Sequence, residues 1–188
     1  KIERASKLIT TGIKVGVNYA KYYGEKIVKS EEEAKENLNE ANATDIYDGL
    51  KTLKGSALKV AQMLSMEKNI LPRAYVEKFS LSQFSVPPLS SPLVVKTFRK
   101  YFKKAPTEVF DTFTSESVNA ASIGQVHKAT KNKKKLAVKI QYPGVGKSID
   151  SDIDNVFSLL RMSGLIPKDT DLSPLISEAR IQLKREAD

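Results

Sequence analysis

The spacing of apolar residues in this 188-residue chain changes near Pro106. Before that point apolar side chains recur every three or four positions, as on one face of an α-helix, and the clearest stretch covers residues 45–66. Beyond it, short runs rich in Val, Ile and Phe are separated by turn residues, which is typical of β-strands. We expect strands at 109–113, 123–129 and 135–140. The sequence therefore predicts an α+β protein in which helices precede a small antiparallel sheet.

Proline and glycine mark the ends of most other expected helices. These helices are expected at residues 1–30, 71–84, 92–102, 143–164 and from 173 to the end, with an acidic helix or connector at 31–43. The run at 85–92 contains three prolines, so we expect a linker there. We divide the chain into a helical extension, residues 1–104, and a sheet-containing lobe, residues 105–188.

The chain carries a net charge of +9, from 31 Lys and Arg against 22 Asp and Glu. Such a charge favours polyanionic partners: nucleotides, nucleic acids or acidic membrane surfaces. A nucleic-acid binder is the weakest of these, because the lysines are spread along the chain, with one cluster at 131–135, and no aromatic stacking platform accompanies them. The absence of cysteine excludes disulfides and thiolate metal sites. The one histidine, His127, excludes a histidine metal cluster, and we expect it to be structural.

Four small residues, Gly12, Gly16, Ala20 and Gly24, recur every four positions in the first expected helix and so share one face. We expect this face to pack closely against another helix. Gly55 lies inside the clearest helix, where glycine costs about 1 kcal/mol relative to alanine, so we expect a close backbone contact there. The sequence shows no signal-peptide pattern and no apolar stretch of about 18 residues.

Lys139 lies in the third expected strand, within the sequence Ala-Val-Lys-Ile at 137–140. In protein kinases a strand tetrapeptide of this type carries the lysine that binds the α- and β-phosphates of ATP. Alternation along the strand puts Lys139 and Ala137 on one face and Val138 on the other. Taken alone, the tetrapeptide also fits a surface lysine on an edge strand.

The segment Asn-Ala-Ala-Ser-Ile-Gly-Gln at 119–125 precedes that strand, where a kinase has its glycine-rich phosphate loop. Small side chains at Ala120, Ala121 and Ser122 let backbone N–H groups approach phosphate oxygens. Because alanine disfavours positive φ, we expect this loop to be stiffer than a glycine loop and to hold a nucleotide in a different pose.

Four motifs occur in a characteristic order. They are Lys-Val-Ala-Gln at 59–62, Asn-Ala-Ala-Ser-Ile-Gly-Gln-Val-His at 119–127, Ala-Val-Lys-Ile-Gln-Tyr-Pro-Gly-Val at 137–145 and Glu-Ala-Asp at 186–188. This order resembles the UbiB/aarF-domain family of atypical kinases, which includes the mitochondrial coenzyme Q kinases. Two positions depart from the family's pattern: Ala61 replaces the glycine of Lys-x-Gly-Gln, and Asn119 replaces the first alanine of Ala-Ala-Ala-Ser.

The resemblance implies a protein-kinase-like small lobe with an N-terminal helical extension, truncated before the large lobe. It implies an ATP-binding atypical kinase or ATPase that supports isoprenoid quinone biosynthesis, with ATP and Mg²⁺ as cofactors. The matched motifs assign Lys139, Glu186 and Lys59 as catalytic residues, Ala120, Ala121, Ser122, Lys139 and Gln62 as nucleotide-binding residues, and Asp188 as a metal ligand. The alternative is a non-catalytic, pseudokinase-like scaffold that binds nucleotide or lipid.

In kinases the strand lysine also needs a glutamate from a following helix. Glu178 and Glu186 are both candidates to meet Lys139, and we prefer Glu186 because it lies in the matched motif. The resemblance places the helix that carries Lys59 over the nucleotide cleft. We therefore expect the Lys59 ammonium near Glu186 or Asp188, on the side of the sheet that carries Lys139.

The sequence contains no His-Arg-Asp-like catalytic loop and no Asp-Phe-Gly, which supply the base and most Mg²⁺ ligands of kinases. We therefore expect this chain alone to be inactive. The expected partners are a nucleotide and a membrane lipid or quinone precursor, with no nucleic acid, and a homodimer is considered. We expect a cytoplasmic protein at a membrane surface, in the bacterial cytosol rather than the mitochondrial matrix.

Overall fold

The computed structural model describes residues 2–188 except positions 54, 68, 85–86, 121–122 and 167–168. Its helical elements are α1 (Ile2–Glu25), α2 (Glu31–Leu53), α3 (Ser56–Met66), α4 (Arg73–Ser80), the 3₁₀ turn η1 (Leu81–Phe84), α5 (Ser91–Phe102), α6 (Pro106–Val109), α7 (Val145–Met162) and α8 (Ser173–Ala187). Its strands are β1 (Thr112–Phe113), β2 (Asn119–Ala120), β3 (Gly124–Lys131) and β4 (Lys134–Gln141). The mixture of helices with a small antiparallel sheet confirms the predicted α+β class.

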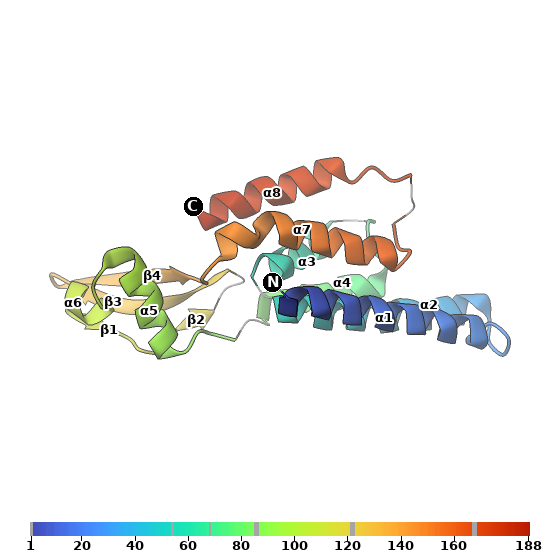
Figure 1. Ribbon diagram of the computed structural model, residues 1–188, viewed down its shortest axis with the longest axis horizontal. Coiled ribbons are helices and arrows are strands. Elements are labelled where there is room, and N and C mark those ends of the chain that lie inside the picture. Colours follow the sequence, from blue (N-terminus) through green and yellow to red (C-terminus); the bar gives the residue numbers. More distant parts are fainter. Residues whose placement is uncertain (1, 54, 68, 85–86, 121–122, 167–168) are drawn as a thin grey trace.

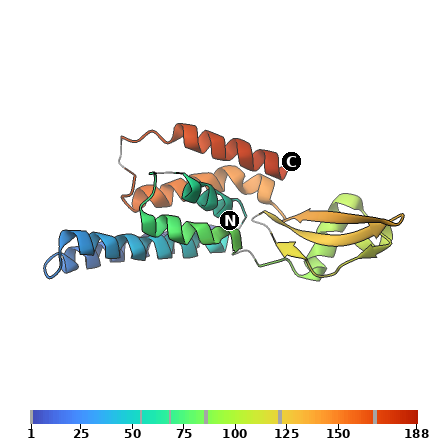
Figure 2. The same cartoon turned by 180° about the vertical axis from the view of Figure 1, so that it is seen from behind.

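The molecule is elongated, with the sheet at one end and most helices at the other (Figure 1). Helices α1 and α2 pair along one side, and α7 and α8 lie on the other side of α3, as both views show (Figure 2). Their shared core contains aliphatic side chains that are almost fully buried, among them Ile46, Leu50, Leu58, Ile153 and Leu160. Each such side chain stabilises the fold by about 1.5–3 kcal/mol relative to an exposed one. We call this group of helices, α1 to α4 with α7 and α8, the helical body.

The helix predicted over residues 45–66 is two helices, because the chain turns at Gly55 between α2 and α3. Gly55 has φ 55° and ψ −124°, a conformation that only glycine adopts without strain. A Cβ atom built there would lie 3.3 Å from Val145 Cγ2. The expected close contact is confirmed, but a single continuous helix was wrong. The acidic segment at 31–43, for which the sequence left a connector open, is helical throughout as part of α2.

The sheet has β3 in the middle, flanked by β1 and β2 along one edge and by β4 along the other. The strand predicted at 109–113 was mostly wrong: α6 occupies its beginning and β1 comprises only two residues. Pro106 begins that short helix, and the Glu108 carboxylate accepts a hydrogen bond from the Ala105 N–H, which caps it. The turn between β3 and β4 has Asn132 and Lys133 both at positive φ.

Alternation along β3 and β4 gives the sheet two different faces. Gln125 lies opposite Ile140, and both are buried on the face that α5 covers. A second, smaller core forms there from Val94, Phe98 and Ile140, with partly buried Phe110 packed against it. Hydrophobic packing therefore groups α5 with the sheet, and α7 and α8 with the helical body. The division between residues 104 and 105 stays a prediction.

The small-residue face of α1 is mostly exposed. A Cβ atom built on Gly16 or Gly24 would have no neighbour within 4 Å, so the expected close packing was wrong at both positions. At Gly12 a built Cβ would lie 2.6 Å from Met162 Cε, and here the expectation is confirmed. The helix packs against α2 through its other face, which includes the buried Val15 and Asn18. None of the helices in the described part of the chain is long and apolar enough to cross a membrane.

Candidate nucleotide site

Lys139 projects from the sheet face opposite α5. It lies on β4, directly across from Val126 of β3, whereas its neighbours Val138 and Ile140 pack toward α5. The side chain is exposed, and no carboxylate in the described ranges forms an ion pair with it. Among the described residues the Lys139 ammonium is therefore unpaired, on an exposed face where an anion could reach it.

Lys59 and Glu186 form an ion pair between α3 and α8. The Lys59 Nζ lies 3.0 Å from Glu186 Oε1, and the two side chains are 22% and 37% exposed. Beside this pair, Gln141 Nε2 donates a hydrogen bond of 3.0 Å to the carbonyl oxygen of Ala187. Gln141 is two positions from Lys139 on β4 and so belongs to the same sheet face. We predicted that the Lys59 ammonium lies near Glu186 or Asp188, on the side of the sheet that carries Lys139, and the pair with Glu186 confirms this.

The preferred partner of Lys139 is therefore engaged elsewhere. Glu186 pairs with Lys59 and not with Lys139, which corrects the expected strand-lysine pair. The other candidate, Glu178, accepts a hydrogen bond of 3.0 Å from Gln182 Nε2 on the exposed side of α8. Lys59, on a helix that precedes the sheet in the sequence, pairs with the carboxylate that was expected to meet Lys139.

The small-residue loop connects β2 to β3. Ala120 ends β2 opposite Gln125, which sets the loop at the end of a hairpin, as in kinases. Ala121 and Ser122 lie outside the described residues. A Cβ atom built on Gly124 would lie 2.8 Å from the Ile140 carbonyl oxygen, so the loop's glycine is needed for β3 and β4 to approach. The geometry fixes both ends of the expected phosphate loop.

Two further predicted site residues, Gln62 and Asp188, form no side-chain contact among the described residues that would indicate their role. Gln62 is partly exposed one helical turn after Lys59 on α3. Asp188 is exposed at the end of α8, where its backbone N–H donates to the Lys184 carbonyl oxygen. Within the described residues, no group of three or more His, Asp or Glu side chains is placed to hold a metal ion. Their assigned roles stay predictions.

Gln125 has a role that the sequence did not reveal. It is fully buried, its Oε1 accepts from the Leu89 N–H at 2.5 Å, and its Nε2 lies 2.9 Å from His127 Nε2. The His127 Nδ1 lies 2.7 Å from the Thr114 carbonyl oxygen, so Nδ1 carries the proton and Nε2 accepts from Gln125. This confirms a structural histidine. The i, i+2 spacing of Gln125 and His127 on one buried strand face was the available signal.

Tyr142 lies just beyond β4, where the sheet joins the helical body. It is 8% exposed, and its hydroxyl has no hydrogen-bond partner among the described residues. Burial raises the pKa of the Tyr142 hydroxyl. The side chain lines a cavity of about 420 Å³ together with Gly55, Leu89 and Leu93. This cavity is distinct from the face that carries Lys139.

Comparison with known proteins identifies the family. The model of the ABC1 atypical kinase-like domain matches residues 81–188. The chain is 40% identical over 153 residues to "Atypical kinase coq-8, mitochondrial" of Caenorhabditis elegans, covering 80% of this chain and 20% of that protein. It is 37% identical to "Atypical kinase COQ8, mitochondrial" of Saccharomyces cerevisiae, covering 80% of this chain and 30% of the relative.

A solved structure with a similar sequence is "The complex structure of Rv3197-erythromycin from Mycobacterium tuberculosis", at 26% identity and a TM-score of 0.43 over 85% of this chain and 41% of that one. The relatives named mitochondrial are eukaryotic, so the expected preference for a bacterial cytosol gains no support. The chain spans only a fifth to a third of the length of these two curated relatives. The family model and the relatives agree with the motifs described above, and the chain belongs to the ABC1 (UbiB/COQ8) family of atypical kinases.

Proposed function

We propose that this chain forms the ATP-binding small lobe, with its covering helices, of an atypical kinase or ATPase that supports isoprenoid quinone biosynthesis at a membrane surface. The observation that carries the proposal is the free ammonium of Lys139 on the open sheet face, next to the end of α8 that Lys59 holds. A lysine there attracts a polyanion, and the β2–β3 loop lies at the same end of the sheet.

Most of the predicted site residues receive a role in this proposal. Lys139 binds the α- and β-phosphates, and the small-residue segment 120–122 serves as the phosphate loop, because its small side chains do not obstruct an anion. Mg²⁺ takes one or two carboxylates together with phosphate oxygens and water, and Asp188, exposed and unpaired among the described residues, fits that donor set. ATP supplies the transferable phosphoryl group. Lys59 holds Glu186 away from Lys139, so α3 controls when the site is complete.

Substitution at Lys139 tests the proposal, with a matched control on the same sheet face. Lys139→Ala removes the phosphate-binding ammonium, and we expect at least a tenfold loss of ATP affinity, about 1.4 kcal/mol, with unchanged thermal stability because the side chain is exposed. Lys128→Ala removes another exposed lysine, from the adjacent strand, and is expected to leave ATP affinity unchanged. Calorimetric titration of both variants with Mg-ATP makes the comparison.

Turnover is measured in a protein where this chain is followed by a kinase large lobe, since we propose that the chain alone is inactive. Equal ATP affinity in the parent and in Lys139→Ala would contradict the site. If the parent binds no ATP, either as this chain alone or when followed by a large lobe, the scaffold alternative replaces the kinase proposal.

A further inference from the structure

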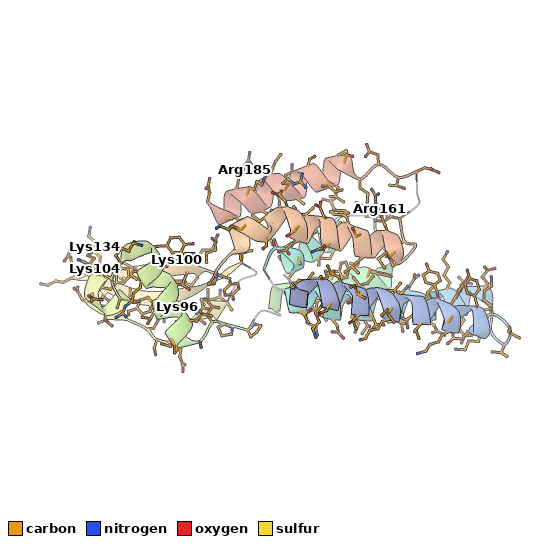
Figure 3. The ribbon with its side chains drawn as sticks, in the orientation of Figure 1. Lys96, Lys100, Lys104, Lys134, Arg161 and Arg185 are labelled. Carbon is orange, nitrogen blue, oxygen red and sulfur yellow. The ribbon has the colours of Figure 1, made fainter. Side chains whose placement is uncertain are left out.

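The part of the chain that forms α5 and the sheet carries almost all of the chain's net charge. Between residues 91 and 142 there are eleven Lys and Arg against three Asp and Glu, in a chain whose net charge is +9. Nine of these basic side chains, all exposed, belong to α5, to the residues that follow it and to the tip of the β3–β4 hairpin: Lys96, Arg99, Lys100, Lys103, Lys104, Lys131, Lys133, Lys134 and Lys135. We call this set the basic end; Figure 3 shows Lys96, Lys100, Lys104 and Lys134 gathered around the sheet.

Carboxylates do not neutralise the basic end. Of the acidic side chains in this part of the fold, Glu108 accepts a hydrogen bond from the Ala105 N–H and Asp111 accepts one of 2.8 Å from the Asn132 N–H. Neither forms an ion pair with a basic side chain in the described ranges. The positive charges are therefore available to an external anionic partner. The sequence had shown only the cluster at 131–135; folding brings the α5 lysines beside it.

Two large aromatic side chains are exposed among these lysines. Tyr101 and Phe102 are 66% and 60% exposed. The Lys100 Nζ lies 5.4 Å from the centre of the Tyr101 ring, and the Phe102 ring stacks on Phe98 at 4.4 Å between ring centres. Exposed aromatic rings surrounded by lysine are typical of surfaces that enter the headgroup layer of a membrane.

The composition favours a lipid surface over other polyanions. Eight of the nine basic side chains are lysine, a flexible point charge that suits a diffuse negative surface, whereas arginine is preferred where single phosphates are read by paired hydrogen bonds. Lysine is also depleted in protein–protein interfaces. Clusters of four to eight basic residues on a helix indicate anionic-lipid binding.

We propose that the basic end docks on an anionic lipid bilayer, with its lysines among the headgroups and Tyr101 and Phe102 at the boundary with the acyl chains. This inference rests on the membrane-surface part of the proposed function and names the surface that would make the contact. Because α5 covers the sheet face opposite Lys139, docking through α5 leaves the candidate nucleotide site open. Nucleotide binding and membrane binding then use different parts of the lobe and are separable by mutation.

Charge reversal at the basic end tests the proposal. The variant Lys100→Glu/Lys104→Glu/Lys134→Glu is compared with Lys21→Glu/Lys147→Glu/Arg161→Glu, which changes the net charge equally at exposed positions elsewhere. Binding is measured by co-sedimentation with vesicles of phosphatidylcholine alone, or of phosphatidylcholine mixed with phosphatidylserine. Each lysine near an anionic surface strengthens binding about fivefold, so we expect a loss of more than about a hundredfold in the first variant. The control variant is expected to lose less than about tenfold, and phosphatidylcholine alone to bind neither.

Insertion of the aromatic side chains is followed at a single labelled position. The chain has no cysteine, so Tyr101→Cys provides a unique thiol for an environment-sensitive fluorophore. Tyr23→Cys, at a position 65% exposed compared with 66% for Tyr101, is the matched control on α1. We expect phosphatidylserine vesicles to shift the emission of the label at 101 toward that of an apolar environment and to leave the label at 23 unchanged.

Three results would overturn the inference. If the two charge-reversal variants lose vesicle affinity equally, the protein still binds membranes, but the basic end is not the surface that makes the contact. If the parent does not bind vesicles, both the proposed membrane location and the docking of the basic end are contradicted. Titration of the same sample with ATP tests the nucleotide site separately. Tighter binding of a single-stranded oligonucleotide than of the vesicles, lost in the first variant alone, would identify a nucleic-acid surface instead.

Discussion

Lys59 and Lys139 lie near the same end of α8 but differ in their surroundings. Lys59 is mostly buried and reaches Glu186, whereas Lys139 is exposed without a carboxylate partner in the part of the chain that the structure describes. A partly buried ammonium loses hydration and needs a counter-charge, which Glu186 supplies. An exposed ammonium on a strand is free to bind an incoming anion. Lys59 is thus suited to holding α8 against α3, and Lys139 is suited to binding a nucleotide.

The Lys59–Glu186 pair should contribute measurably but modestly to stability. Both side chains retain solvent contact, at 22% and 37% exposure, so we expect a coupling free energy of about 1 kcal/mol rather than the larger value of a fully buried pair. Lys59→Met, Glu186→Gln and the double variant form a double-mutant cycle, measured by chemical denaturation. A coupling free energy indistinguishable from zero would show that the pair does not hold α3 to α8.

Tyr142 should make the fold sensitive to alkaline pH. Burial raises the pKa of its hydroxyl above the unfolded value of about 10. The unfolded chain therefore loses this proton first as the pH rises, so the free energy of unfolding is constant below about pH 10 and falls above it. Tyr142→Phe removes this component and, because the hydroxyl has no partner among the described residues, should not lower stability at neutral pH.

Thermal denaturation between neutral pH and about pH 11 compares Tyr142→Phe with Tyr23→Phe, whose ring is exposed. We expect the first variant to lose less stability than the parent above pH 10 and the second to behave as the parent does. The same alkaline loss in all three proteins would mean that Tyr142 does not titrate as a buried group. Tyr19 and Tyr75, whose pKa values burial also raises, should add to the alkaline sensitivity in all three proteins.

At the scale of elements, Gly55 decides that α2 and α3 are separate helices. Its φ of 55° is strained for any other residue, and a Cβ atom would lie 3.3 Å from Val145 Cγ2. We expect Gly55→Ala to lower the free energy of unfolding by about 1–3 kcal/mol. Gly16→Ala is the matched control, because it is exposed inside α1 with no atom within 4 Å of a built Cβ.

The control should raise stability, by about 0.5–1 kcal/mol, since alanine is the better helix former. Circular dichroism during thermal denaturation gives both values. Stabilisation by Gly55→Ala would mean that a continuous helix across residues 45–66 is accessible after all. Because Gly55 precedes Lys59 by one helical turn, the break also sets where the Lys59 side chain meets α8.

Local sequence patterns predicted most helices and strands but did not predict where a helix breaks or where a short helix replaces a strand. Alternation placed β3, β4 and the two faces of the sheet, and it put Lys139 on the open face. Apolar periodicity continues through Gly55, so it does not reveal the break that backbone strain and Val145 impose there. At 109–113 an apolar run suggested a strand, but Pro106 begins a short helix first. The approach of Gly55 to Val145 joins distant segments and lies outside any local window, whereas Pro106 is a local signal that the apolar run outweighed.

At the scale of the whole molecule, the site was predictable where motifs matched and unpredictable where it depends on long-range contacts. The Lys59–Glu186 pair follows from the motif resemblance and was expected. The Gln125 tether to Leu89 joins residues 36 positions apart and could not be read from spacing alone. The basic end likewise depends on α5 packing against the sheet. Sequence gives each segment's charge, whereas only the fold shows which segments are neighbours.

The division of the hydrophobic side chains into two clusters predicts unequal local stability. The helical body has an extensive core, whereas the sheet and α5 share a small one built around Val94, Phe98 and Ile140. Less buried apolar area means a lower free energy of opening. We therefore expect native-state hydrogen exchange to show two levels of protection, with amides of β3 and β4 opening at lower free energy than those of α3 and α7.

Two large-to-small substitutions test whether the two levels of hydrogen-exchange protection are independent. Phe98→Ala, which removes the ring that contacts Phe102 and Phe110, should reduce protection in β3 and β4 and leave α3 and α7 unchanged. Leu58→Ala, in the core of the helical body, should reduce protection in α3 and α7 by about 2–5 kcal/mol. Exchange followed by mass spectrometry of peptides resolves these segments. If Phe98→Ala lowers protection equally in all four elements, the small core is not independent and the molecule opens as a single cooperative unit.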